Sequence, residues 1–331
     1  MSELAIAAFA ARTGAHLVAA PRQARFAAFE RSFDASAYAE ELAAAGVRWL
    51  ARSDPAFPAL LRAIHDPPVG LFVRGSADVS ILSRPAVAVV GARACSSYGT
   101  QVARSFGRDL AAAGLVVVSG LARGVDGEAH RGAVDAGGIT VGVLGCGVDR
   151  DYPAAHRDLA RRMCDGGGLV VSEYAPGVEP APWRFPARNR VIAGLAATTV
   201  VVEARERSGA LITADLALEE GRDVFAVPGE IYSALAAGTN ALLRLGAAPA
   251  TSPADVLELY GLEAEVAVAP PVGAAAATVL ACLADGPAGA DELTRSTGLD
   301  PAELAAALTE LELGALVGQA DGLYRGVRPA V

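Results

Sequence analysis

Residues 115–133 read LVVVSGLARGVDGEAHRGA. The stretch begins with the apolar run 115–118, which predicts a buried parallel strand, and it continues into the first turns of a predicted helix. Between the two, Gly120 and Gly124 let the backbone approach a ligand closely, and Arg123 adds a positive charge. Free N–H groups and the helix dipole favour an anion at such a junction. The stretch therefore predicts a phosphate-binding edge on an α/β sheet.

The surrounding sequence alternates strand-like and helix-like segments. Each strand-like segment is rich in β-branched and apolar residues on both faces, as strands covered on two sides are. The predicted strands are 86–91, 115–120, 139–145, 169–173, 198–204 and 224–229. Helical patterns lie between them, for example at 98–114 and 209–221. We therefore predict that residues 81–262 form an α/β domain with an extended Rossmann-like, doubly wound sheet.

The segment before this domain, residues 1–80, is expected to be mainly helical. Short alanine-rich amphipathic patterns lie near 3–12, 21–30 and 36–45, followed by one short strand at 71–75. This pattern predicts a small helical domain. We expect it to be SAM-like or helix-hairpin-helix-like.

The segment after the α/β domain divides into a linker and a last domain. Residues 263–274 are rich in proline and small residues, which is typical of a linker. Residues 275–331 show three helical patterns and two short strands around Asp321–Gly322, which predicts a winged-helix-like domain. From residue 275 onward eight acidic residues stand against three arginines. This balance favours a protein-contact or packing role over duplex binding.

Composition excludes several classes of protein. The 331 residues carry a net charge of −9, which disfavours a general polyanion binder, and all 28 basic residues are arginine. The chain therefore has neither a P-loop lysine nor a Schiff-base lysine. Its four cysteines are scattered, so a zinc site or a disulfide framework is not expected. Apolar runs are shorter than the roughly 20 residues that span a bilayer, and the N-terminus lacks a signal-peptide pattern. We expect a cytoplasmic protein without membrane association.

The other predicted strand ends narrow the choice of ligand. The first strand ends in Gly91-Ala92-Arg93 without a GxGxxG fingerprint, which disfavours a nicotinamide enzyme. Between residues 181 and 210, five arginines stand against two acids, and aromatic side chains are interleaved with them. These interleaved residues are Trp183, Arg184, Phe185, Arg188 and Arg190. The composition is typical of a platform for single-stranded nucleic acid, and equally consistent with an ordinary basic surface.

Candidate catalytic groups are few. Asp126 and His130 lie four residues apart on one helix face and could hold a metal or relay a proton, but no third ligand is near in sequence. A structural contact at the helix start is therefore favoured for this pair. Asp149 and Glu173 lie near strand ends without a nucleophile partner. We predict no catalytic residue, metal or cofactor.

Taken together, these motifs resemble the DNA processing protein A family, also called Smf. The resemblance rests on ordered blocks that cover roughly residues 85–247. These blocks are VAVVGARACSSYG, SGLARGVDGEAHRGA, TVGVLGCGVDRDYP, LVVSEYAPG, FPARNRVIAGL and VVVEARERSGALITADLALEEGRDVFAVPG. The resemblance implies a dimeric protein, not known as an enzyme, that binds and protects incoming single-stranded DNA and helps load the RecA recombinase during natural transformation. Single-strand binding protein is a further candidate partner.

The family's functional positions can be transferred onto matching residues. Arg123 matches a DNA-contacting arginine and Phe185 a base-stacking aromatic, and Arg207 stands where many relatives have lysine. His156 replaces a common asparagine, with no consequence that we can assign. The resemblance implies a single-strand site formed by Arg93, Ser119, Gly120, Arg123, Gly124, Phe185, Arg188, Asn189, Arg190, Arg207, Ser208 and Gly209. It implies a dimer and recombinase face that includes Leu218, Leu242, Leu243 and Arg244.

Two alternative hypotheses remain at this point. The first is a nucleotide-binding or nucleotide-hydrolysing Rossmann-like enzyme that uses the same phosphate edge, with Asp126 or Glu173 as its base. The second is that the winged-helix domain binds duplex DNA while the α/β domain only dimerises.

Overall fold

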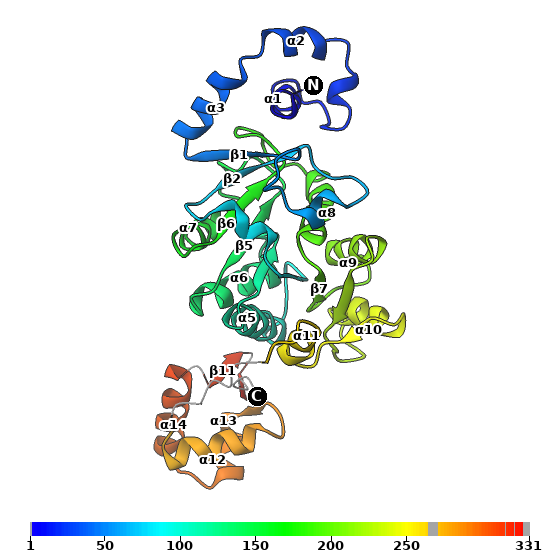
Figure 1. The fold of residues 1–331 in the computed structure, drawn as a ribbon. Helices are drawn as coiled ribbons and strands as arrows, with labels where there is room; N and C mark the ends of the chain where they lie inside the picture. The colour runs from blue at the N-terminus through cyan, green and yellow to red at the C-terminus, as the bar shows by residue number, and fades with distance from the viewer. Residues whose placement is uncertain (1, 264–270, 315, 321, 327–331) are drawn as a thin grey trace. The chain divides into compact units, whose positions relative to one another are not determined.

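The computed structural model describes residues 2–263, 271–314, 316–320 and 322–326. Contacts divide the chain into two compact units, residues 1–263 and residues 264–331. Figure 1 shows the fold of both units. In the described part of the chain, every helix is too short or too polar to cross a membrane.

A nine-stranded sheet forms the centre of the larger unit. Its order is β1-β2-β6-β5-β4-β3-β7-β8-β9. The strands from β6 to β9 pair in parallel, whereas β1 pairs with β2 and β2 with β6 in antiparallel fashion. The bounds are β1 Val47–Ala51, β2 Gly70–Arg74, β3 Ala86–Val90, β4 Val116–Ser119, β5 Thr140–Leu144, β6 Leu169–Ser172, β7 Thr198–Val201, β8 Asp223–Ala226 and β9 Ala248–Pro249. The predicted doubly wound α/β sheet is therefore confirmed.

Helices cover both faces of this sheet, with α5, α6 and α7 on one side and α8, α9 and α10 on the other (Figure 1). The N-terminal segment contributes α1 Glu3–Thr13, α2 Phe26–Ser32, α3 Ala35–Ala44 and α4 Ala59–Arg62. The others are α5 Ser97–Ala112, α6 Val125–Asp135, α7 Arg157–Asp165, α8 Arg184–Leu195, α9 Gly209–Glu219, α10 Ala237–Arg244 and α11 Pro253–Leu259. Short 3₁₀ turns span Ala20–Arg22, Val79–Ser83 and Ala154–His156.

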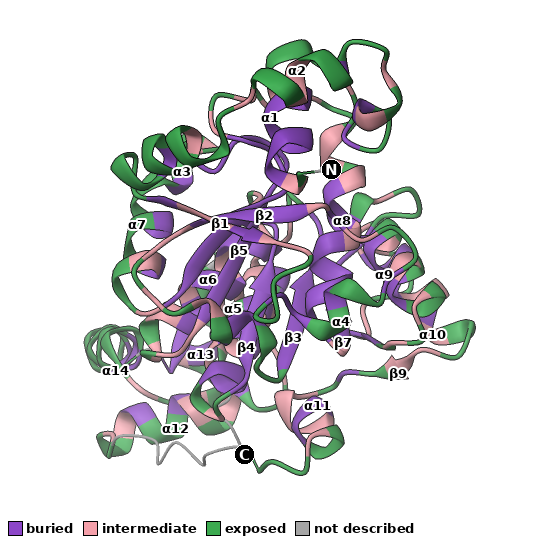
Figure 2. Ribbon diagram, turned by 45° about the horizontal axis from the view of Figure 1, so that its top comes forward, coloured by how far each residue is buried: buried purple, intermediate pink, exposed green. Residues whose placement is uncertain are grey.

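Apolar strands buried on both faces explain this architecture. In Figure 2 the central strands of the sheet are coloured almost continuously as buried. Val116 and Val118 of β4 point to the core that holds Ile192 of α8 and Ala214 of α9. The intervening Val117 is buried as well. A strand apolar on both sides requires helices on both sides, which is the arrangement found.

One strand was not predicted. We expected residues 1–80 to be helical apart from the strand at 71–75, yet β1 lies at 47–51 and extends the sheet through β2. Arg48 and Trp49 interrupt its apolar pattern, and both are only partly buried. Such a short edge strand lacks the continuous apolar run that revealed the central strands.

The smaller unit has the winged-helix pattern that we predicted. It contains α12 Ala274–Leu283, α13 Ala290–Thr297, α14 Pro301–Leu313 and the strands β10 Ala288–Gly289, β11 Val317–Ala320 and β12 Leu323–Gly326. The Asp300 carboxylate accepts hydrogen bonds from the backbone N–H groups of Ala302 and Glu303, and the Glu303 carboxylate accepts one from the Asp300 N–H. This reciprocal pair is a capping box, which fixes the start of α14. Asp321 of the predicted turn, and most of the predicted linker, lie outside the described residues.

Candidate nucleic-acid interface

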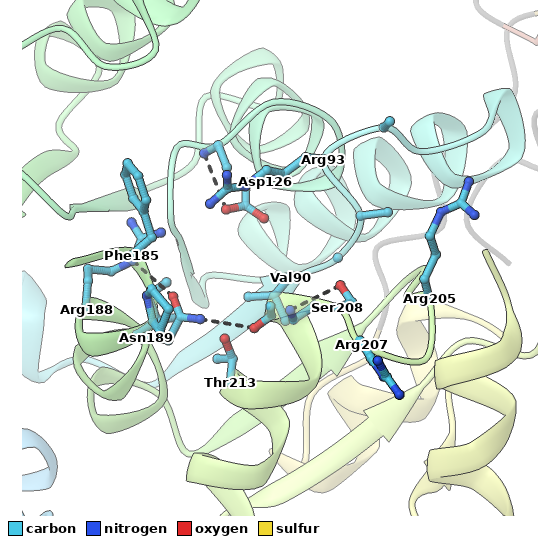
Figure 3. A pocket seen from close by; sticks show the side chains of 18 of the residues that line it. Val90, Arg93, Asp126, Phe185, Arg188, Asn189, Arg205, Arg207, Ser208 and Thr213 are labelled. Atoms are coloured by element: carbon cyan, nitrogen blue, oxygen red, sulfur yellow. Dashed lines mark hydrogen bonds between the residues drawn. The ribbon is translucent and has the colours of Figure 1, made fainter. Parts of the chain in front are cut away.

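A cleft of about 670 Å³ opens at the carboxyl ends of β3, β4 and β7. Strand β3 lies between β4 and β7, so the chain winds outward from β3 in both directions. The point where the winding direction reverses is where ligands bind in open α/β sheets. Segments 90–94, 185–189 and 205–213 supply most of the lining, as Figure 3 shows.

The loop between β4 and α6 is tightly constrained. Gly124 has φ +73°, and a Cβ at this position would collide with the Ala92 carbonyl oxygen. At Gly120 a Cβ would lie 2.5 Å from the Arg188 guanidinium. The Asp126 carboxylate accepts the backbone N–H groups of Gly120 and Ala122 at 3.1 and 3.4 Å. Gly124 is therefore required by its backbone conformation and by space, whereas a side chain at Gly120 would displace the Arg188 and Asp126 side chains. Asp126 has the structural role favoured from the sequence.

Ser119 and Arg123, two of the predicted site residues near this loop, differ in burial. Ser119 is buried and donates its hydroxyl to the Val89 carbonyl at 2.6 Å, which ties β4 to β3. Arg123 is exposed at the loop tip and makes no hydrogen bond or ion pair with any described residue. Of these two residues, only Arg123 presents its side chain to solvent. Arg123 is not among the residues that line the cleft.

Arg188 lies in the floor of the cleft and is only 4% exposed. Its guanidinium donates to the carbonyls of Gly120, at 2.9 Å, and Val143, and its Nε donates to the Asn189 side-chain oxygen. Burial lowers the pKa of Arg188 to about 10 and raises the pKa of Asp126 beside it. Arg188 remains charged at neutral pH, but its hydrogen-bonding capacity is largely used to hold the floor together.

An aromatic stack stands at one wall of the cleft. The rings of Phe185 and Tyr152 lie parallel within 20°, with centroids 5.4 Å apart. The guanidinium carbon of Arg93 lies 5.1 Å from the Phe185 centroid. Phe185 is half-buried, whereas Arg93 and Tyr152 are exposed. The wall therefore offers π-faces and a cation to a ligand.

The segment after β7 adds two exposed arginines, Arg205 and Arg207, and neither pairs with a described residue. Ser208 caps α9 by accepting the Ala210 N–H at 3.3 Å. Asn189 donates its amide to the Gly209 carbonyl at 3.1 Å, which joins the start of α9 to α8. Figure 3 shows Arg205 and Arg207 on the opposite side of the cleft from Phe185.

Arg190, by contrast, is not brought into the cleft. It donates to both carboxylate oxygens of Glu173, at 2.8 and 2.7 Å, and to Asp66 at 2.9 Å. These two carboxylates raise its pKa despite the burial. Arg190 and Glu173 line a separate small pocket together with His16 and Tyr174.

The other predicted positions are distributed as follows. On α9, Leu218 is 52% exposed. On α10, Leu242 is packed in the core, Leu243 is half-buried and Arg244 is exposed. His156 is buried, and its Nδ1 lies 3.0 Å from the Leu121 carbonyl, so it supports the loop that carries Arg123.

His130, the second member of the Asp126–His130 pair, has a structural role in the core. His130 is fully buried with its Nδ1 2.6 Å from the Thr140 hydroxyl, and burial lowers its pKa to about 3. The described residues contain no group of three or more His, Cys, Asp or Glu side chains that could hold a metal ion.

Among the aromatic and charged residues that line the cleft, sequence reasoning did not single out Tyr152 and Arg205. Tyr152 follows β5 in a loop whose sequence indicates only a turn. Its contact with Phe185, 33 residues later, depends on how two loops meet at the sheet edge. Arg205 was counted only as part of the local excess of arginines. Its position close to Arg207, directly after a predicted strand, could have indicated that it lies at the cleft.

Comparison with known proteins assigns the chain to a family. The family described as DNA recombination-mediator protein A matches residues 48–261, about two thirds of the chain. The chain belongs to this family. A DprA winged helix domain matches residues 263–322. These matches confirm both the resemblance and the predicted C-terminal domain.

Individual relatives of the family agree. The chain is 47% identical over 204 residues to DNA processing protein DprA of Streptococcus pneumoniae, covering 62% of this chain and 71% of that protein. It is 38% identical over 291 residues to Protein Smf of Escherichia coli, covering 83% and 76%. The solved structure of the S. pneumoniae protein has a TM-score of 0.64 and 38% identity over 77% of this chain and 91% of that chain. A Helicobacter pylori DNA processing protein A, reported for its single-stranded DNA binding mode, has a TM-score of 0.56 and 29% identity over 61% and 92%.

Proposed function

We propose that this recombination-mediator chain binds single-stranded DNA across the cleft at β3, β4 and β7. The observation that carries the proposal is the wall formed by Phe185, Tyr152 and Arg93, with unpaired arginines on the opposite side. Bases of any sequence can stack on aromatic faces, while arginines follow the phosphates. The H. pylori relative, whose structure is reported for its single-stranded DNA binding mode, supports this choice of ligand.

We further propose that the chain acts as a homodimer that protects the strand in the cytoplasm and helps load a RecA-type recombinase onto it. Family membership supports this role. The exposed Leu218 on α9 and Arg244 on α10 offer a surface for such contacts, whereas Leu242 would act only by supporting α10 from the core.

The direct test is fluorescence anisotropy of labelled oligo-dT at fixed salt with Phe185→Ala and Arg123→Glu. Phe185→Ala removes one stacking face, so we expect a loss of about 1–3 kcal/mol of binding free energy. Arg123→Glu reverses an exposed, unpaired charge and should weaken binding without affecting the fold.

The matched control is Arg161→Glu on α7. Arg161 is largely exposed, has only a 3.7 Å contact with Asp158, and lies outside the cleft. If the two site variants bind as tightly as the control, the DNA site lies elsewhere on the molecule.

A further inference from the structure

Trp183, immediately before α8, is held firmly yet remains 47% exposed. The guanidinium carbon of Arg184 lies 4.8 Å from the Trp183 ring centroid, and the His16 ring lies 5.7 Å away. Tyr174 meets Trp183 edge-on at 6.4 Å. Three side chains from separate segments therefore fix the indole while much of its surface faces solvent.

The supporting side chains are themselves anchored. Arg184 donates to the Glu179 carbonyl and lies 5.3 Å from the Tyr174 centroid. His16 follows α1, where its Nδ1 accepts the Val18 N–H at 3.3 Å and the adjacent Leu17 is buried. A fixed aromatic face loses little conformational entropy when a ligand stacks on it.

Trp183 is also continuous with the cleft. Its chain neighbours Pro182, Phe185 and Pro186 all line the cleft. The carboxylates of Glu173 and Asp66, which line the small pocket beside His16, share the single positive charge of Arg190, which offsets one of their two negative charges.

We propose that Trp183, backed by His16, is a second base-stacking position for a single strand that leaves the cleft past Phe185. The N-terminal segment would then form part of the DNA-binding surface through His16. This inference rests on the proposed function. It adds an aromatic step that lies outside the cleft and a role for residues before the α/β domain.

The chain offers a direct optical test, because its only tryptophans are Trp49 and Trp183. Trp49 lies in β1 against Phe72, at 4.6 Å between ring centroids. In a Trp49→Phe chain all tryptophan emission comes from Trp183. We expect oligo-dT to quench this emission with the same midpoint as the anisotropy of the labelled strand.

A matched pair of substitutions in the otherwise intact chain makes the test independent of the Trp49 change. Trp183→Phe keeps an aromatic face and should retain most of the affinity. Trp183→Leu keeps an apolar side chain without the π-face and should weaken binding about tenfold. Equal urea-unfolding midpoints for the two variants would show that the loss is not a folding defect. His16→Ala should weaken binding less than Trp183→Leu.

The outcomes separate this inference from the proposed function. Tight binding without quenching, together with equal affinities for Trp183→Leu and Trp183→Phe, would overturn the second stacking position and leave the cleft intact. Failure of the unmodified chain to bind oligo-dT would overturn both.

Discussion

Arginine residues with the same charge play different roles in this molecule, and their partners decide which. Arg123, Arg205 and Arg207 are exposed and unpaired among the described residues, so they are available to phosphates. Arg188 holds the cleft floor through carbonyl groups, and Arg190 is engaged by two carboxylates. The sequence block FPARNR could not separate these roles, because Asp66 and Glu173 are brought to Arg190 only by the fold.

We predict that Arg190→Ala lowers stability rather than DNA affinity per folded molecule. Glu173 is only 3% exposed, so removing its partner leaves a buried carboxylate unpaired. Breaking such a pair costs about 3–5 kcal/mol. Urea unfolding should show the loss, whereas Arg123→Ala should leave the transition unchanged. A stable Arg190→Ala chain with weakened binding would instead indicate that Arg190 contacts DNA.

A pH dependence follows from His130. Because burial lowers its folded-state pKa to about 3, His130 stays neutral in the fold while the unfolded chain takes up a proton below about 6.5. The contribution of His130 to the free energy of unfolding is therefore fully present above pH 6.5. It falls by up to about 1.4 kcal/mol per pH unit as the pH decreases towards 3. Burial raises the pKa of Asp126, so this group makes the folded state relatively more stable as the pH falls, opposite to His130.

The test compares melting temperatures of the unmodified chain and His130→Gln between pH 7 and pH 4. Asp126 is present in both chains and cancels in the comparison. The variant should be less stable at neutral pH and should lose less stability on acidification. Parallel curves would show that His130 does not contribute to the acid dependence.

At the level of elements, the β4–loop–α6 junction could be predicted most fully. Apolar runs, glycines and the helix start all occur in one local stretch, so its geometry follows from short-range sequence. The aromatic wall could not be predicted to the same extent, because Tyr152 and Phe185 come from loops after different strands. Strand β1 was missed because it is short, lies at the edge and carries Arg48 and Trp49.

We expect Gly124→Ala to damage this junction. The φ of +73° and the clash with the Ala92 carbonyl oxygen add to each other, so the cost should exceed about 2 kcal/mol, and oligo-dT binding should weaken. Gly137→Ala is the matched control. Gly137 has φ +68° with nothing within 4 Å, so only the backbone cost of about 1 kcal/mol applies there. Equal losses in the two variants would contradict a crowded loop.

At the scale of the whole molecule, the chain separates into two compact units and the cleft lies entirely in the larger one. Truncation after Glu263 should therefore retain the affinity of the full chain for oligo-dT in anisotropy titrations. Loss of binding on truncation would favour the alternative in which the winged-helix domain is the DNA-binding part. We expect binding to be retained because the winged-helix domain is acidic, with eight acidic residues against three arginines from residue 275, and should contribute little to binding a polyanion.

The most direct test of the central claim is oligo-dT anisotropy across a salt series for the unmodified chain and Arg123→Ala. Each phosphate engaged by a cation contributes about −0.7 to the slope of log affinity against log salt. We predict a negative slope for the unmodified chain, and for Arg123→Ala a weaker affinity with a slope shallower by about 0.7. Identical affinities and slopes for the two chains would contradict a single-strand site that includes the loop between β4 and α6.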